Sequence, residues 1–331
     1  MNNMLNKDIG IDLGTVNILV YLKGKGIILN EPSVIVIEEE TKKPIAYGTE
    51  ANEMLGRTPG KIRAIRPMKD GVIADFDMVE LLLNSILSKI NIKNKIIKPK
   101  ILICCPSNIT EVEKNAIRDA AYRVGAKKVI VEEEPKVAAI GAGLEIGKPI
   151  GNMIVDIGGG TTDVAVLSLG EIVTSASIKT AGNTFDEDII NYIKNKYKLL
   201  IGEKTAEKIK KEIGTAKSEN KKEKLEIKGR DLVGGLPKSI YITSEEIEQA
   251  LKDSVEKILK VIKMVLEQTP PELSADIIEK GIILTGGGSL LKNLDKYLEE
   301  NLKIPVFLAE DPLSCVALGT GIMLDKINYI I

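Results

Sequence analysis

The sequence predicts an α/β protein built from two similar halves. Strand-like runs of Ile, Val and Leu alternate with amphipathic helical runs along the chain, which is the pattern of α/β folds. The chain has 331 residues, enough to bury a sizeable core and to form more than one domain. A short pattern near the N-terminus recurs in the second half, and such internal repetition indicates a duplicated fold.

Strands are expected in the same order in both halves, with hairpins first and parallel strands later. The first half should hold hairpin pairs within 9–22 and 27–38, with turns at 23–26 and 39–43, then strands at 101–105 and 129–131. The second half repeats this plan with strand-like runs at 154–167, 171–178, 281–285 and 306–308. A helix between strands 101–105 and 129–131 makes them a parallel β–α–β unit.

Helices are expected wherever apolar residues recur at helical spacing. The predicted helices span 77–90, 111–124, 136–144, 186–196, 244–268 and 313–324. Two of them open with a sequence typical of a capping box, Asp77 with Glu80 and Thr110 with Glu113. The highly charged region 205–236 contains a further partly apolar helix, and we expect a small subdomain there.

The repeated pattern consists of a strand, an aspartate and a glycine turn that carries hydroxyl or amide side chains. It reads IDLGTVN around Asp12 and VDIGGGTTD around Asp156. Glycines at 14, 158, 159 and 160 permit positive φ and expose backbone N–H groups to a closely approaching ligand. One such turn alone is explained by a glycine-rich hairpin. Two at equivalent places favour a pair of phosphate-binding turns.

A carboxylate beside a phosphate requires a cation, because two negative groups repel each other. Asp12 and Asp156 end their strands next to the two turns. Mg²⁺ held mainly through water molecules removes this conflict. The sequence therefore predicts Asp12 and Asp156 as a magnesium site.

Two other segments are candidates for the site. The run GGGSLL at 286–291 follows a strand, and its glycines let a flat ring or sugar lie against the backbone, although glycines also serve ordinary strand-to-helix turns. Glu134 follows a strand and precedes Pro135, which fits the first turn of a helix. Its carboxylate could orient a water molecule, or it could simply stabilise the helix N-terminus as acids do.

The composition excludes several classes of function. Histidine is absent, which rules out His-based catalytic triads and metal sites. A net charge of −1 and an aromatic content of 3% argue against a nucleic-acid partner. The chain has no Walker A sequence, no secretory leader and no long apolar run, and its three cysteines lie in apolar stretches. We therefore expect a cytoplasmic protein.

The motifs together resemble those of a known superfamily. DLGTVN, DIGGGTTD, LTGGGSLL and DPLSCVALGTG are similar to the phosphate-1, phosphate-2, adenosine and connecting motifs of the actin, sugar-kinase and heat-shock-chaperone ATPases. The segment 67–77 and the sequence EEPKVAAIGAG resemble the MreB family of bacterial actins, and the similarity covers essentially the whole chain. This resemblance implies an actin-like ATPase fold, with two similar halves, each a mixed β-sheet flanked by helices, a nucleotide cleft between them and two small subdomains.

The resemblance also implies domain boundaries. The first large subdomain would comprise 1–32, 65–145 and 313–331, with a small subdomain at 33–64 inserted in it. The second large subdomain would comprise 146–181 and 243–312, with a small subdomain at 182–242.

By the same resemblance, the ligands are ATP or ADP and Mg²⁺, and the site residues are assigned from the matching motifs. Glu134 and Thr161 would be catalytic, with Glu134 positioning the attacking water, and Asp12 and Asp156 would hold Mg²⁺ through waters. The nucleotide-binding residues would be Thr15, Val16, Asn17, Gly158, Gly159, Gly160, Thr161, Glu207, Lys208, Ile209, Lys210, Gly287, Gly288, Ser289 and Leu290.

The implied function is that of a slow ATPase that polymerises into cytoskeletal filaments and contributes to cell shape. Its expected partners are further copies of itself, the inner membrane surface and membrane-bound cell-shape proteins. Ile96 and Ile97, ringed by lysines, fit a membrane-contacting loop, or equally a solvated loop before the next strand. Another actin-superfamily ATPase, such as a small-molecule kinase or a chaperone-like ATPase, is the alternative.

Overall fold

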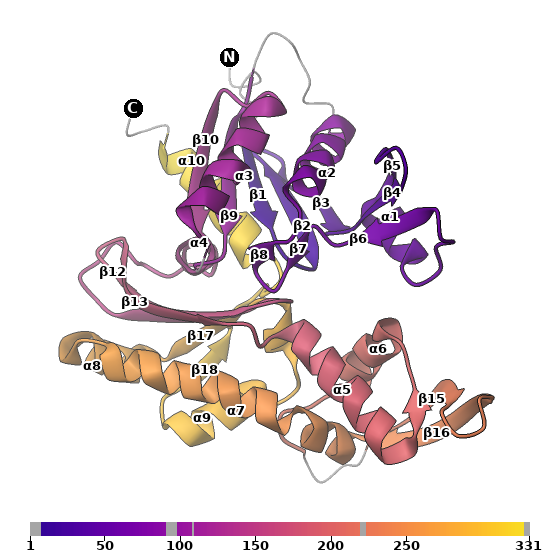
Figure 1. The fold of residues 1–331 in the computed structure, drawn as a ribbon. Helices are drawn as coiled ribbons and strands as arrows, with labels where there is room; N and C mark the ends of the chain where they lie inside the picture. Colours follow the sequence, from indigo (N-terminus) through magenta and orange to yellow (C-terminus); the bar gives the residue numbers. More distant parts are fainter. Residues whose placement is uncertain (1–7, 91–97, 108, 219–222, 328–331) are drawn as a thin grey trace. The chain divides into compact units, whose positions relative to one another are not determined.

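The computed structural model describes residues 8–90, 98–107, 109–218 and 223–327 (Figure 1). The chain divides into two compact units. Unit 1 comprises residues 1–148 and 313–331, and unit 2 comprises residues 149–312. The finer division into four subdomains stays a prediction.

Unit 1 is built on a five-stranded mixed sheet in the order β10-β9-β1-β2-β3. β1 pairs antiparallel with β2 and parallel with β9, and β9 pairs parallel with β10. The strands are β1 (Ile9–Leu13), β2 (Asn17–Leu22), β3 (Gly26–Pro32), β9 (Lys100–Cys105) and β10 (Lys128–Glu133).

Helices cover both faces of this sheet. On one face α2 (Phe76–Lys89) and α3 (Glu111–Arg123) bury their apolar sides in a single core with the odd-numbered residues of β1, Ile9 and Ile11. Since side chains alternate along a strand, Gly10 points to the other face. There α10 (Cys315–Ile327) packs so closely that a Cβ on Gly10 would lie 1.8 Å from Thr320 Oγ1.

α4 (Glu134–Gly141) and α10 pack backbone against backbone. A Cβ on Gly141 would lie 1.8 Å from the carbonyl oxygen of Cys315, and one on Gly319 would lie 2.0 Å from that of Val137. Glycine is therefore required at both positions, because any side chain would force the helices apart.

Smaller elements complete unit 1. A three-stranded sheet in the order β5-β4-β6 lies beside α1, and a two-stranded hairpin joins β7 to β8. Their bounds are β4 (Ile35–Glu38), β5 (Pro44–Tyr47), α1 (Gly48–Met54), β6 (Ile62–Ile65), β7 (Met68–Lys69) and β8 (Val72–Ile73). Glu31 ties these parts together, since its carboxylate accepts hydrogen bonds from Thr49 N (2.8 Å) and Lys89 Nζ (2.6 Å).

Unit 2 repeats the main sheet of unit 1 with the same order and the same directions. Its five strands run β13-β12-β11-β17-β18, and β11 pairs antiparallel with β12 and parallel with β17. The strands are β11 (Asn152–Ile157), β12 (Thr162–Ser168), β13 (Glu171–Ile178), β17 (Ile282–Thr285) and β18 (Val306–Leu308). The predicted duplication is thus present at the level of sheet topology.

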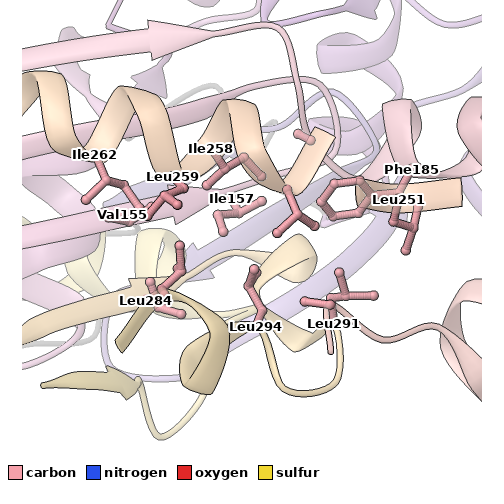
Figure 2. Close-up of a cluster of buried hydrophobic side chains, with 14 of the residues drawn as sticks. Val155, Ile157, Phe185, Leu251, Ile258, Leu259, Ile262, Leu284, Leu291 and Leu294 are labelled. Atoms are coloured by element: carbon pink, nitrogen blue, oxygen red, sulfur yellow. The ribbon is translucent and has the colours of Figure 1, made fainter. Parts of the chain in front are cut away.

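The core of unit 2 lies between this sheet and its helices. Figure 2 shows Phe185 of α5 and Leu251 and Ile258 of α7 gathered near Val155 and Ile157 of β11. The helical elements are α5 (Gly182–Tyr197), α6 (Glu203–Ile213), α7 (Ser244–Gln268), α8 (Pro271–Lys280), the 3₁₀ turn η1 (Gly287–Leu290) and α9 (Leu294–Leu302). A small sheet, β14-β15-β16, packs with α6; its strands are β14 (Leu199–Leu200), β15 (Lys224–Asp231) and β16 (Pro237–Thr243).

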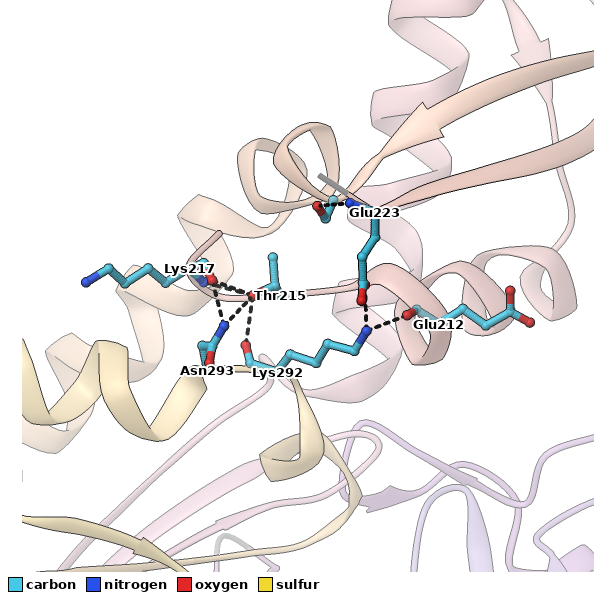
Figure 3. Close-up of polar contacts among 7 residues, drawn as sticks. Glu212, Thr215, Lys217, Glu223, Lys292 and Asn293 are labelled. Atoms are coloured by element: carbon cyan, nitrogen blue, oxygen red, sulfur yellow. Dashed lines mark hydrogen bonds and ion pairs between the residues drawn. The ribbon is translucent and has the colours of Figure 1, made fainter. Parts of the chain in front are cut away.

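Polar contacts join the chain after α6 to the segment between η1 and α9 (Figure 3). Lys292 Nζ donates to the carbonyl oxygen of Glu212 (2.6 Å) and forms an ion pair with Glu223 (2.7 Å). The hydroxyl of Thr215 lies 3.1 Å from the carbonyl oxygen of Lys292, and Asn293 Nδ2 donates to that of Lys217 (2.9 Å).

Several local predictions differ from the structure. The Thr110–Glu113 capping box is confirmed. The Asp77–Glu80 box was wrong, because α2 begins at Phe76 and its cap is Asp75, whose carboxylate accepts from Met78 N (3.2 Å). Helices α1 and α8 and strands β6, β15 and β16 were not predicted from the sequence. The two missed helices are short, and the three strands are largely charged or only half-buried, so none shows a strong apolar period.

Candidate functional site

The first candidate turn lies between β1 and β2 in unit 1. Thr15 is buried, and Val16 and Asn17 are partly exposed. A Cβ on Gly14 would lie 2.6 Å from the carbonyl oxygen of Asn17, so the turn is too tight for a side chain at that position.

The acceptor groups of this turn are bonded from within the unit. Ser33 Oγ donates to the carbonyl oxygen of Gly14 (2.6 Å), and Ser33 N donates to that of Val16 (2.7 Å). Gly71 N, in the turn between β7 and β8, donates to Thr15 Oγ1 (3.3 Å). The Thr15 hydroxyl can still donate its own proton, because accepting a hydrogen bond does not use it.

The second candidate turn occupies the same place in unit 2, between β11 and β12. Gly158 N donates to the carbonyl oxygen of Thr161 (2.9 Å) and closes the turn. The first residues of α5 hold it, since Gly182 N donates to Gly158 O (3.1 Å) and Asn183 N to Gly159 O (2.8 Å). The turn therefore rests on a helix N-terminus, whose amides are otherwise without intrahelical partners.

The predicted positive φ is not found at the glycines of these two turns. Gly14, Gly158, Gly159 and Gly160 all have negative φ. At Gly14 the requirement is steric, as the 2.6 Å approach shows. Positive φ is instead found at Gly286 (φ 80°) of the third motif.

Asp12 is placed at the end of β1, beside the first turn. It lies in register with Cys104 on β9, which in turn pairs with Glu132 on β10. Removal of its carboxyl from water raises the pKa of Asp12 to about 7. A desolvated carboxylate of this kind gains from a nearby cation, so the residue fits the predicted Mg²⁺ role.

Glu134 reaches the same edge of the unit 1 sheet. It is the first residue of α4, directly after β10, with Pro135 in the first turn of the helix. Burial raises the pKa of the Cys104 thiol well above its usual value, and the charges of Asp12 and Glu134 raise it further. Both carboxylates are thus close enough to Cys104 to act on it electrostatically.

Asp156 lies at the corresponding strand end of unit 2. It is 6% exposed and pairs in register with Thr285 at the end of β17. The backbone of the third motif passes directly over it, because a Cβ on Gly286 would lie 2.4 Å from Asp156 Oδ1 and 2.3 Å from Ile157 O. The structure therefore brings the second and third motifs together within unit 2.

The third motif is a 3₁₀ turn rather than the start of an α-helix. Ser289 is buried and its hydroxyl donates to Gly286 O (2.6 Å), which holds the turn. A Cβ on Gly288 would lie 2.4 Å from Ile157 Cγ2, and Leu290 is 48% exposed. The predicted contacts of Gly287 with a nucleotide remain a prediction.

The four residues predicted on α6 have different surroundings. Lys210 Nζ donates to Gly182 O (2.7 Å) and pairs with Asp186 (2.8 Å), which places it beside the second turn. Ile209 is fully buried in the core of unit 2, and its predicted contact with a nucleotide remains a prediction. Lys208 and Glu207 form pairs along the helix, with Glu212 and Lys211 respectively.

Two signals were missed by sequence reasoning. Ser33 bonds the first turn directly, and Asp186 bonds Lys210 beside the second turn; neither was predicted, because each contact joins residues distant in sequence. The predicted membrane residues Ile96 and Ile97 lie outside the described residues. Within the part of the chain that the structure describes, no helix is long and apolar enough to span a bilayer, and no cluster of three potential metal ligands occurs.

Two units of one topology, each with an aspartate and a glycine turn at the same strand end, define an actin-like α/β protein. A family model described as MreB/Mbl protein matches residues 6–331. The cell shape-determining protein Mbl of Bacillus cereus is 61% identical over 325 residues, covering 98% of each chain. The cell shape-determining protein MreB of Escherichia coli is 49% identical over 331 residues, covering 98% of this chain and 95% of that relative.

A solved structure agrees with the sequence relatives. The crystal structure of MreB 5 of Spiroplasma citri bound to AMPPNP superimposes with a TM-score of 0.93 at 45% identity, covering 97% of each chain. The chain therefore belongs to the MreB/Mbl family, and its predicted actin-like fold is confirmed.

Proposed function

We propose that this protein binds ATP with Mg²⁺, hydrolyses it slowly and assembles into filaments that contribute to cell shape. The observation that carries the proposal is the duplicated aspartate–glycine turn at equivalent strand ends of two sheets with the same topology. Relatives described as cell shape-determining proteins, and a relative solved with AMPPNP, support it.

In this proposal the protein acts mainly by positioning. The turns at Thr15–Asn17 and Gly158–Thr161 donate hydrogen bonds to phosphate oxygens, as phosphoryl transfer requires. Asp12 and Asp156 would hold Mg²⁺ through waters, and the ion would supply neutralisation of the phosphate charge. Glu134, at the start of α4, orients the attacking water. Lys210 lies beside the second turn and Ser289 lies in the third motif. In this proposal both residues contact the nucleoside.

The hydrolytic step is tested with Glu134→Ala. This variant should bind ATP with wild-type affinity but release phosphate at least tenfold more slowly, because it no longer orients water. Glu133→Ala is the matched control, since Glu133 is the adjacent acid and pairs instead with Lys114 (3.7 Å). Equal rates in the two variants would remove Glu134 from the mechanism.

Assembly is tested by sedimentation. With ATP and Mg²⁺ the purified protein should pellet and show filaments in electron micrographs, and it should remain in the supernatant without nucleotide. A protein that stays in solution with ATP and transfers its γ-phosphate to a sugar would overturn the filament proposal in favour of a small-molecule kinase.

We also propose that the filaments lie on the inner face of the cell membrane, through Ile96 and Ile97. Replacing both by Ser should reduce co-sedimentation with phosphatidylglycerol vesicles, since two apolar side chains are lost from a lysine-rich segment. The control replaces Ile45 and Val112 by Ser, which are exposed apolar residues elsewhere in unit 1 (47% and 75%). Equal vesicle binding by both double variants would place the membrane contact elsewhere.

A further inference from the structure

In each unit, the residues that follow the third strand of the main sheet (β3 in unit 1 and β13 in unit 2) form hydrogen bonds to the candidate phosphate turn. In unit 2 this support comes from the backbone, through the amides of Gly182 and Asn183. In unit 1 it includes a side chain, because the hydroxyl of Ser33, just after β3, donates to Gly14 O. A side-chain support can be removed by mutation without altering the backbone.

Ser33 is well placed to hold the turn in one conformation. The residue is fully buried, so its hydroxyl does not exchange partners with bulk water. It forms two short hydrogen bonds to the turn, from Oγ to Gly14 O (2.6 Å) and from N to Val16 O (2.7 Å). These two carbonyl groups flank Thr15 and are fixed towards the protein.

The direction of these carbonyl groups matters for an anionic ligand. A carbonyl oxygen that faces a phosphate repels it, whereas backbone N–H groups and hydroxyl protons attract it. Ser33 turns the oxygens of Gly14 and Val16 inwards, and Gly71 N does the same for the Thr15 hydroxyl oxygen (3.3 Å). Three acceptor groups of the turn are therefore already bonded within the protein before any ligand arrives.

We propose that Ser33 is a positioning residue that preorganises the Gly14–Asn17 turn for the phosphate groups of the nucleotide. The inference rests on the proposed ATP-binding function. It predicts that Ser33 affects the affinity for polyphosphate and leaves the affinity for the nucleoside unchanged, since the hydroxyl acts through the turn alone.

The test compares Ser33→Ala with Ser85→Ala by isothermal titration of ATP, ADP and adenosine into the full-length protein. Ser85 is a matched control, because its hydroxyl also donates to a carbonyl oxygen of unit 1, that of Leu81 (2.8 Å), but within α2. Ser33→Ala should bind ATP and ADP about fivefold more weakly than the control, as expected for one lost hydrogen bond, with adenosine affinity unchanged within about twofold.

A second variant separates positioning from folding. Ser33→Cys keeps the shape of the side chain, with a somewhat larger atom and a weaker donor, and it should weaken ATP binding to an intermediate extent without lowering the melting temperature appreciably. The inference is overturned if the Ser33 variants bind ATP as Ser85→Ala does. It is also overturned if they lose affinity for adenosine and ATP equally, which would indicate general destabilisation. If the wild-type protein binds no ATP, the proposed function itself fails, and this inference with it.

Discussion

Replacing Lys210 by Met should destabilise the protein strongly, whereas replacing its partner Asp186 by Asn should cost little. Both side chains are largely buried, with 17% of Lys210 and 14% of Asp186 exposed. The ammonium group bonds Asp186 Oδ2 (2.8 Å) and Gly182 O (2.7 Å). The pair therefore joins α6 to the start of α5, which in turn holds the Gly158 turn.

Each substitution leaves one largely buried charge, but the two remaining charges differ in the hydrogen-bond partners that they keep. Lys210→Met removes both hydrogen bonds and strands the Asp186 carboxylate, which costs about 3 kcal/mol, at the low end for a broken buried pair because some exposure remains. Asp186→Asn leaves the Lys210 ammonium with two acceptors, the asparagine oxygen and Gly182 O, so the loss should be smaller, about 1 kcal/mol.

The cost of Lys210→Met in free energy of unfolding should depend on pH, because Asp186 titrates. Burial raises the pKa of Asp186, even though Lys210 lowers it. A carboxyl whose pKa is higher in the folded state makes stability fall as pH rises through that value. Lys210→Met removes the effect of Lys210 that lowers this pKa, so the cost of the substitution should be smaller at low pH, where protonation removes the unpaired charge, and should grow as the pH rises.

The assay is urea unfolding of the nucleotide-free protein, followed by far-UV circular dichroism because the chain lacks tryptophan. Wild type, Lys210→Met and Asp186→Asn are compared at pH 4.5 and pH 7. Equal losses for the two variants, or a Lys210→Met cost that does not change with pH, would refute the reasoning.

Two further predictions concern unit 1. Gly319→Ala should lower the free energy of unfolding by about 2 kcal/mol or more, because its Cβ would lie 2.0 Å from Val137 O. Gly147→Ala is the control, since there is open space around the added methyl group, and it should be neutral in the same urea experiment. Burial raises the pKa of the Cys105 thiol to about 12, so at pH 8 iodoacetamide should label it at least tenfold more slowly in the folded protein than in urea; equal labelling rates would contradict this.

The sequence alone determined the features that depend on short-range patterns. The amphipathic period located α3 and α7 to within two residues at each end, because an apolar face must recur every three or four positions. The repeated aspartate–glycine turn predicted two sheets of one topology, and both have the same strand order. The motif set also predicted the family, which the comparisons confirmed.

The tertiary structure decided which side chains support those turns. Ser33 lies 19 residues from Gly14, and Lys210 lies 28 residues from Gly182, and no periodicity links either pair. The apolar spacing of α6 already indicated that Ile209 is buried, but only the tertiary structure places its neighbour Lys210 beside the turn. The physical reason is that a turn or a helix is stabilised by neighbours along the chain, whereas a support for it is chosen by packing between distant segments.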